Sequence, residues 1–247
     1  MKSLKGVGLP EVLISLFIST LIMTSLVQGY LSHKRQYLST LSNMEIQFDI
    51  NWLADLMRQS FMRVGFTPCV SLAQLTTQDR RYADKPLEYL SIQPVPEPLI
   101  AISYMGEAIS EVIQIKGARH VLADRPFLLN PRHSIIITDC HYAEVQDITD
   151  IKANEQGVLI QLKKPLTFQY SDKIYIGEWI EEKWLVRADS KGKKRFYLQS
   201  HHLEELTAKV SDVKVFAHTN ENKNWIDVLL KAKKNFSYHL VTMMRNL

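Results

Sequence analysis

The sequence is poor in the residues and spacings on which most catalytic motifs depend. Its 247 residues include only two cysteines and nine glycines. Cys69 and Cys140 are too far apart for a CxxC redox motif or a zinc ribbon. The sequence contains no P-loop, GxGxxG or GxSxG motif, and no histidine pair has HExxH spacing. We therefore expect no enzymatic activity, no cofactor and no metal ion, and we favour surface positions for His120, His133, His141, His201, His202, His218 and His239.

The net charge of the chain is also small. The formal net charge is +4, and removal of residues 1–6 with Lys2 and Lys5 would leave +2. A nearly neutral chain gives no general reason to expect acidic partners or nucleic acid. Basic residues at 191–195 and 231–234 do lie beside Phe196, Tyr197 and Phe236, as a single-strand DNA groove would require. We favour solvated hairpin tips with core aromatics, so DNA is not the direct ligand that we expect.

Charged residues are missing from one long segment. No Asp, Glu, Lys or Arg occurs from Val12 to His33, which is long enough to span a bilayer. Lys2 and Lys5 precede this segment and favour a cytoplasmic N-terminus. A secretory signal peptide would need a small-x-small cleavage site after the apolar stretch, and the sequence there has none. A simple signal anchor stays open.

Glu11 lies at the start of this apolar segment. A carboxylate in lipid is costly and usually has a partner. Cleavage after Gly6 would create an α-amino group at Val7, four residues before Glu11. A neighbouring subunit could then pair its amine with this carboxylate. Pro10 would cost little here, because the first amides of a helix lack intrahelical partners.

The segment KGVGLPEVLISL, residues 5–16, resembles the prepilin cleavage motif. Its matching features are Lys5, Gly6, a hydrophobic first mature residue at Val7, and Glu11 at mature position five. The resemblance implies cleavage between Gly6 and Val7, N-methylation of Val7, and a role for Glu11 in subunit assembly. Val7 and Gly8 depart from the usual Phe and Ser or Thr.

An apolar face continues the helix beyond the membrane segment. Leu41, Met44, Phe48, Trp52 and Leu56 recur at steps of three and four. The pattern ends near a glycine at 65 and a proline at 68, both typical of a helix end. We therefore predict a leader at 1–6, a transmembrane stem helix at 7–33, its amphipathic continuation at 34–65 and a head at 66–247. Two helices with a break near residue 29 remain an alternative.

The head reads as a β-rich domain. Residues 68–98 suggest an irregular excursion, 104–110 and 202–207 could form short helical turns, and 189–194 suggests a hairpin tip. The fold class is thus α+β, with a long N-terminal helix packed on an antiparallel sheet, as in pilins. Candidate strands are Val112–Ile115, Ser134–Thr138, Val158–Leu162, Lys173–Ile180, Lys183–Ala188, Arg195–Gln199, Val213–Ala217, Ile226–Ala232 and Tyr238–Met244.

Head segments resemble PilW-type minor pilins. The similar stretches are MRVGFTPC at 62–69, IIITDCHYAEVQDIT at 135–149, WLVRAD at 184–189, LEELTAKVSDVKV at 203–215 and VTMMRN at 241–246. Cys69 and Cys140 match cysteines of that family, which favours a disulfide over two free buried thiols if the head leaves the cytosol.

The resemblance implies a minor pilin of the type IV pilus. Its partners would be a prepilin peptidase, the inner membrane, other minor pilins and the major pilin. The head would lie in the periplasm before the subunit enters the pilus at the cell surface, in a priming or tip complex. A J-type minor pseudopilin of a type II secretion system and a single-pass anchored binding protein are the alternatives.

Overall fold

The computed structural model describes residues 8–93, 99–124, 130–154, 156–171, 173–220, 223–232 and 236–244. The expected cleavage site at Gly6 and Val7 lies outside the described residues, as do Lys233 and Lys234 and the end of the VTMMRN segment. The chain divides into two compact units, one ending at Asp49 and the other beginning at Ile50. Each unit is described separately below.

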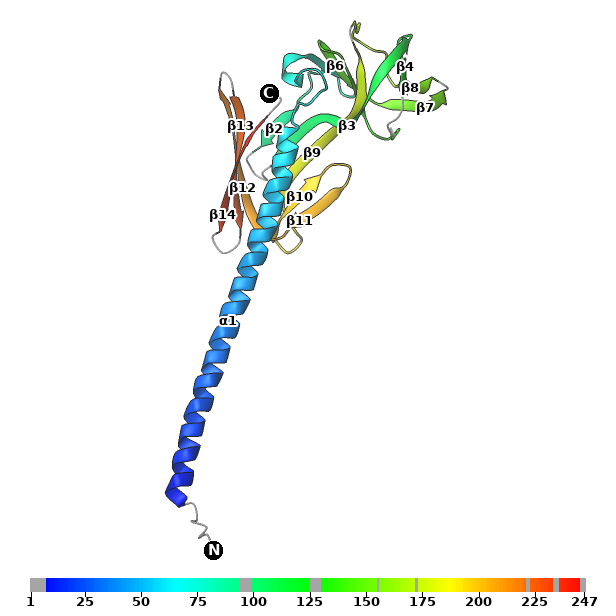
Figure 1. The fold of residues 1–247 in the computed structure, drawn as a ribbon. Helices are drawn as coiled ribbons and strands as arrows, with labels where there is room; N and C mark the ends of the chain where they lie inside the picture. The colour runs from blue at the N-terminus through cyan, green and yellow to red at the C-terminus, as the bar shows by residue number, and fades with distance from the viewer. Residues whose placement is uncertain are drawn as a thin grey trace. The chain divides into compact units, whose positions relative to one another are not determined.

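A single helix, α1, extends from Leu9 to Met62 (Figure 1). The Gly8 carbonyl accepts the N–H groups of Glu11 and Val12 at 3.0 and 3.4 Å, which closes the first turn. Pro10 lies in this turn, where a missing N–H costs no intrahelical bond. The helix passes through Gly29 without interruption, so the prediction of one continuous helix is confirmed and the two-helix alternative is wrong.

The helix face that packs in the head is not the predicted one. Ile50, Leu53, Ala54, Met57 and Phe61 are fully buried in the second unit. These positions follow steps of three and four, as a core-facing helix requires. The predicted stripe is exposed at Leu41, Met44, Phe48 and Trp52, and Leu56 is only half-buried.

The end of α1 is fastened to the sheet through the backbone. Gly65 has a φ of 65°, a left-handed conformation that favours glycine, as its predicted role at the helix end requires. Its N–H donates to the Ser103 carbonyl over 3.0 Å, and the Met105 N–H donates to the Phe66 carbonyl over 3.0 Å. The rings of Phe61 and Trp184 lie 6.4 Å apart. The last turns of the helix are therefore part of the head.

The main sheet of the head has eleven strands (Figure 1). A single path of pairing runs β1-β6-β5-β9-β3-β4-β8-β7, with β2 on β3 and the β10–β11 hairpin on β9. All pairs among the described strands of this sheet are antiparallel except β1 with β6. The strands are β1 Thr76–Asp79, β2 Leu90–Gln93, β3 Leu99–Lys116, β4 His120–Ala123, β5 Ile135–Thr138, β6 Tyr142–Gln146, β7 Ile148–Asn154, β8 Gly157–Leu162, β9 Tyr175–Ala188, β10 Lys194–Gln199 and β11 Leu203–Thr207.

Two long strands, β3 and β9, organise this sheet. The first half of β9 pairs with β5 and its second half pairs with β10. The two strands predicted at 173–180 and 183–188 are therefore one. The helical turn considered at 104–110 is wrong, because this segment belongs to β3 and carries a register shift between Met105 and Ile109 opposite β9.

Two other predictions need correction. A helical turn was considered at residues 202–207, but Leu203–Thr207 form β11, whose backbone pairs with β10. Residues 68–98 were expected to be irregular, but they contain the 3-10 helix Leu72–Gln74 and strands β1 and β2. The Pro-rich run at 94–98 lies outside the described residues.

The C-terminal part of the head forms a second sheet of three antiparallel strands. These are β12 Val210–Asn220, β13 Lys223–Ala232 and β14 Ser237–Met243, in that order. They contain the predicted strands at 213–217 and 226–232 and most of the one at 238–244. Apolar residues alternate along β13, where Ile226, Val228 and Leu230 are fully buried.

Two apolar clusters lie in the core of the described part of the main sheet. One gathers Ile135, Ile137 and Ile176 with residues of β4 and β8, and the other gathers Ile136, Met105 and Trp179 with the 3-10 helix. Neighbouring residues of β5 thus point into different clusters, as the alternation of a buried strand requires.

Candidate functional site

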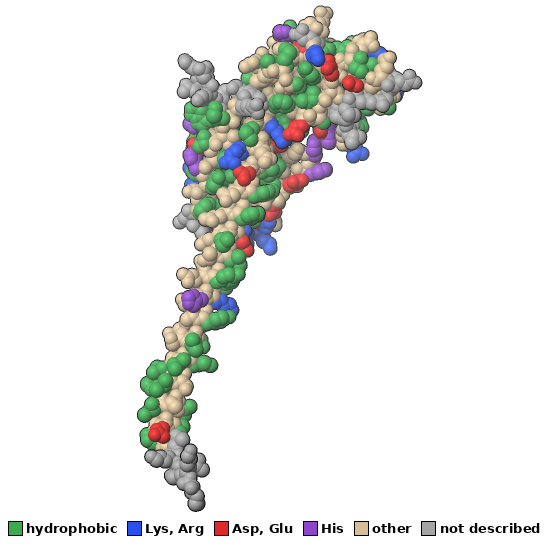
Figure 2. All heavy atoms as spheres, in the orientation of Figure 1, with side chains coloured by type: hydrophobic (Ala, Val, Ile, Leu, Met, Phe, Trp, Pro, Cys, Tyr) green, Lys and Arg blue, Asp and Glu red, His purple; other side chains and the backbone are tan. Residues whose placement is uncertain are grey.

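The first part of α1 has the length and composition of a membrane span. Its large apolar side chains, from Leu9 to Leu31, are all exposed. Figure 2 shows hydrophobic side chains along the visible face of this part of the helix. Among the described residues, α1 is the one helix that is long and apolar enough to cross a membrane, and it lies near the N-terminus. An apolar surface of this kind fits a single-pass anchored protein.

Four hydroxyl groups within this span are hydrogen-bonded to carbonyls of their own helix. Ser15 donates to the Val12 carbonyl over 2.8 Å, and Ser19 donates to the Ser15 carbonyl over 2.7 Å. Thr20 and Thr24 also donate to carbonyls three or four residues earlier. These bonds provide each hydroxyl with an acceptor where lipid offers none.

Glu11 lies in the first turn of α1 and is exposed. Its Oε2 accepts the backbone N–H of Gly8 over 3.1 Å. This is half of a capping box, with glycine in place of Ser or Thr at the N-cap. The carboxylate also lies at the N-terminal end of α1, the positive end of the helix dipole. Its expected partners in cleavage and methylation, Gly6 and Val7, lie outside the described residues.

Cys69 and Cys140 form a disulfide with a Cα–Cα distance of 5.4 Å. Cys69 follows the end of α1, and Cys140 follows β5. The turn at Cys140 is shaped by Asp139, a buried residue whose Oδ1 accepts the N–H groups of His141 and Tyr142 at 2.7 and 2.6 Å. The bridge thus ties the segment after the helix to the turn between β5 and β6.

The basic segment at 191–195 has the features of a hairpin tip. Asp189 Oδ1 accepts the N–H groups of Lys191 and Lys193 at 2.8 and 2.9 Å. Arg195 pairs with Asp189 and Glu205. Phe196 is buried against Trp184, with ring centroids 6.0 Å apart, so its ring offers no platform for a base.

A partly buried charge network lies between β1 and β9. The Arg81 guanidinium is 2.7 Å from Asp79 Oδ2 and 2.6 Å from Glu181 Oε1. The Trp179 indole N–H also donates to Glu181 Oε1 over 2.9 Å. Burial opposes ionisation of Glu181, but the hydrogen bonds from Arg81 and Trp179 outweigh it and hold the pKa of Glu181 below its usual range. The network borders a hollow of about 300 Å³.

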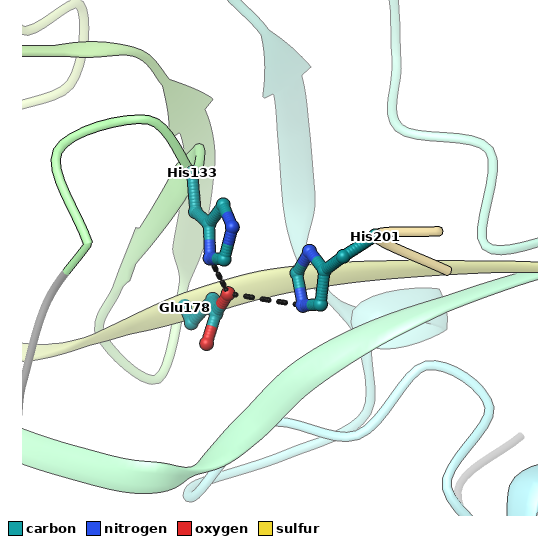
Figure 3. Close-up of side chains that lie close together, drawn as sticks. All are labelled: His133, Glu178 and His201. Atoms are coloured by element: carbon teal, nitrogen blue, oxygen red, sulfur yellow. Dashed lines mark ion pairs between the residues drawn. The ribbon is translucent and has the colours of Figure 1, made fainter. Parts of the chain in front are cut away.

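The head also brings together His133, Glu178 and His201 (Figure 3). Glu178 Oε1 forms an ion pair with Nδ1 of His133 and lies 3.4 Å from Nε2 of His201. The two imidazole rings stack at a centroid distance of 4.0 Å and an interplanar angle of 9°. His133 and Glu178 are about one-quarter exposed, and the His201 side chain is 43% exposed.

Three separate segments supply this cluster, which the sequence pattern did not predict. His133 precedes β5, Glu178 is on β9, and His201 lies in the turn between β10 and β11. Ile135 is the cross-strand partner of Glu178, and the Trp179 N–H donates to the Ser134 carbonyl over 2.9 Å. Strand pairing therefore fixes His133 beside Glu178. No spacing of the three residues along the chain carries this information.

The comparisons with known proteins add no relative. No protein-family model matches this chain, and neither the curated proteins nor the solved structures contain a significant match.

Proposed function

We propose that this chain is a PilW-like minor pilin that enters type IV pilus assembly after cleavage between Gly6 and Val7. The observation that carries the proposal is the position of Glu11. It is the one acidic residue in the first turn of an exposed apolar helix, and no further Asp, Glu, Lys or Arg follows until Lys34. A charge with that placement serves contact between subunits better than it serves simple anchoring.

The surface of the stem supports assembly along its length. Beyond the span, Met44 and Phe48 are 61% and 74% exposed, and Leu41 is 42% exposed. They lie on one helix face and continue the apolar surface past Lys34 and Arg35. A helix that only carried a head away from the membrane would have no need of this face, whereas neighbouring stems in a filament would bury it.

The head supports a location outside the cytosol. Its disulfide is of the kind that persists in oxidising compartments. In this proposal the precursor crosses the inner membrane once, with Lys2 and Lys5 in the cytoplasm and the head in the periplasm. The mature subunit then joins other minor pilins and the major pilin in a priming or tip complex, with Val7 methylated.

N-terminal sequencing of the mature protein tests the proposal. Cells with an active prepilin peptidase should yield a chain that begins at methylated Val7, and cells without the peptidase should yield the uncut precursor. Replacement of Gly6 by a bulky residue should block cleavage. A chain that keeps residues 1–6 in peptidase-positive cells would contradict the proposal and leave a membrane-anchored binding protein.

Deletion of the gene separates the pilus from the secretion system. Loss of surface pili with normal exoprotein secretion is the expected result. Loss of secretion with normal pili would assign the chain to a type II pseudopilus instead.

A further inference from the structure

We propose that His133, Glu178 and His201 bind a divalent transition-metal ion, with Zn²⁺ as the best match. Each of the three residues offers one ligand atom, and these atoms all lie within 4.8 Å of one another. His133 Nδ1 and His201 Nε2 are the nitrogens that approach Glu178 Oε1. Two imidazoles and a carboxylate suit zinc and disfavour calcium and magnesium, which prefer oxygen ligands throughout. This inference does not depend on the proposed role in pilus assembly.

The shared carboxylate oxygen is the strongest sign of a ligand site. Glu178 Oε1 is removed from solvent and accepts no hydrogen bond of normal geometry from the described residues. Its close neighbours are instead the nitrogens of His133 and His201 (Figure 3). A cation placed among these three atoms would replace the two contacts with coordination bonds and balance the charge of Glu178.

Metal binding requires only a small rearrangement. Stacked rings cannot direct both lone pairs at a single ion, so at least one imidazole must turn out of the stack. His133 and His201 both lie in bends outside the strands, and His201 is the more exposed. Glu178 is on β9, held between β5 and β3. The strand therefore supplies the fixed ligand, and the two loops can adjust to it.

The ion would act as a structural cross-link within the head. Among the described strands, β11 pairs only with β10, so the hairpin that carries His201 is fastened to the main sheet through β10 alone. A metal held by His133, Glu178 and His201 would tie the tip of this hairpin to β9 and to the segment before β5. With three protein ligands, a water molecule would complete the tetrahedral coordination of zinc.

The test uses the full chain in detergent, purified without a polyhistidine tag and stripped with a chelator. Titration calorimetry with Zn²⁺ should show saturable binding of one ion per chain, and Co²⁺ should give the visible absorption bands of a tetrahedral site. The variants His133→Ala, Glu178→Gln and His201→Ala should each weaken binding by at least about tenfold. Zinc should raise the unfolding midpoint of the wild type by about 5 °C and leave the variants unchanged.

Two histidine variants serve as matched controls. His202→Ala removes the exposed neighbour of His201, and His239→Ala removes a histidine 2.6 Å from Asp227 in the three-stranded sheet. Both should bind zinc as the wild type does. Circular dichroism in the presence of chelator checks that each variant is folded. If an alanine variant does not fold, His201→Asn, a milder change at an exposed residue, is tested in its place. Absence of saturable binding to the wild type, or equal losses in the controls and the ligand variants, would overturn the site.

Discussion

The backbone N–H of Gly8 donates a 3.1 Å hydrogen bond to the carboxylate of Glu11 within the same chain. Glu11 was expected to rely on the amine of a neighbouring subunit, but part of its hydrogen-bonding capacity is used in its own helix start. This bond and the helix dipole lower the cost of a carboxylate at the membrane edge. If the chain acts as proposed, its insertion into the membrane would therefore need no partner, and insertion would be separate from assembly.

Glu11→Gln should insert into the membrane normally but fail to assemble. The neutral amide keeps an oxygen for the Gly8 N–H but has no charge to pair with an amine on a neighbour. We expect at least about a tenfold loss of the subunit from sheared pili, equivalent to about 1.4 kcal/mol of assembly free energy. Immunoblots of membrane and pilus fractions measure both steps.

Ser15→Ala is the matched control for this change, because it removes a polar group from the same span whose bond lies within the helix. It should assemble as the wild type does. Normal assembly of Glu11→Gln would remove Glu11 from the proposed mechanism.

Loss of the disulfide should destabilise the head. In the chain-entropy model, a bridge that closes a loop of about 70 residues contributes roughly 4 kcal/mol. Cys69→Ser and Cys140→Ser should each lower the unfolding midpoint by about 10 °C, and the double variant should lose no more than either single variant. Reductant should lower the midpoint of the wild type to that of the variants and leave theirs unchanged. Two reactive thiols in the unreduced, unfolded wild type would contradict the bridge.

Some features of the fold could be predicted from the local sequence pattern. Helix α1 shows which feature could not: the face that is buried. Its continuity follows from an uninterrupted helical sequence. Its buried face does not, because α1 carries apolar residues on opposite sides, such as Ile50 on one and Trp52 on the other. Periodicity finds both stripes, but the contact with β9 through Phe61 and Trp184 decides which of them is buried.

The candidate metal site shows a second limit. His133, Glu178 and His201 have no informative spacing, and the sequence favoured surface positions for both histidines. They meet because β5 and β10 pair with different parts of the same edge of β9, the edge opposite β3. Short apolar runs identify such strands, whereas their order and register depend on contacts far apart in the chain.

The charge network at Glu181 should make stability depend on pH. Its folded pKa lies below the unfolded value, so the unfolded state takes up protons first on acidification. Stability from this group is present above the unfolded pKa and is lost as the pH falls through the folded pKa. The Glu181 side chain is 42% exposed, so water screens its charge, and Glu181→Gln should cost no more than about 1 kcal/mol at neutral pH, with a smaller difference from the wild type in acid.

Chemical unfolding of both chains at neutral pH and near pH 3 measures this difference. Glu204→Gln, an exposed change on β11, is the control and should follow the wild type at both values. An equal loss for Glu181→Gln at neutral and acid pH would show that packing, and not ionisation, accounts for its effect.

Gly177→Ala should destabilise the head because the added methyl group would collide with the side chain of Met105. A Cβ at this position on β9 would lie 2.7 Å from Cε and 3.0 Å from Cγ of Met105, beside the register shift in β3. Met105 is fully buried and has little room to move, so overpacking should cost about 1–3 kcal/mol. Gly29→Ala, where a Cβ would meet nothing within 4 Å, should leave unfolding of the head unchanged.

In a double-mutant cycle with Met105→Ala, Gly177→Ala should cost much less than it does alone, because the colliding side chain is gone. Simple additivity of the two changes would mean that Met105 is not the obstacle.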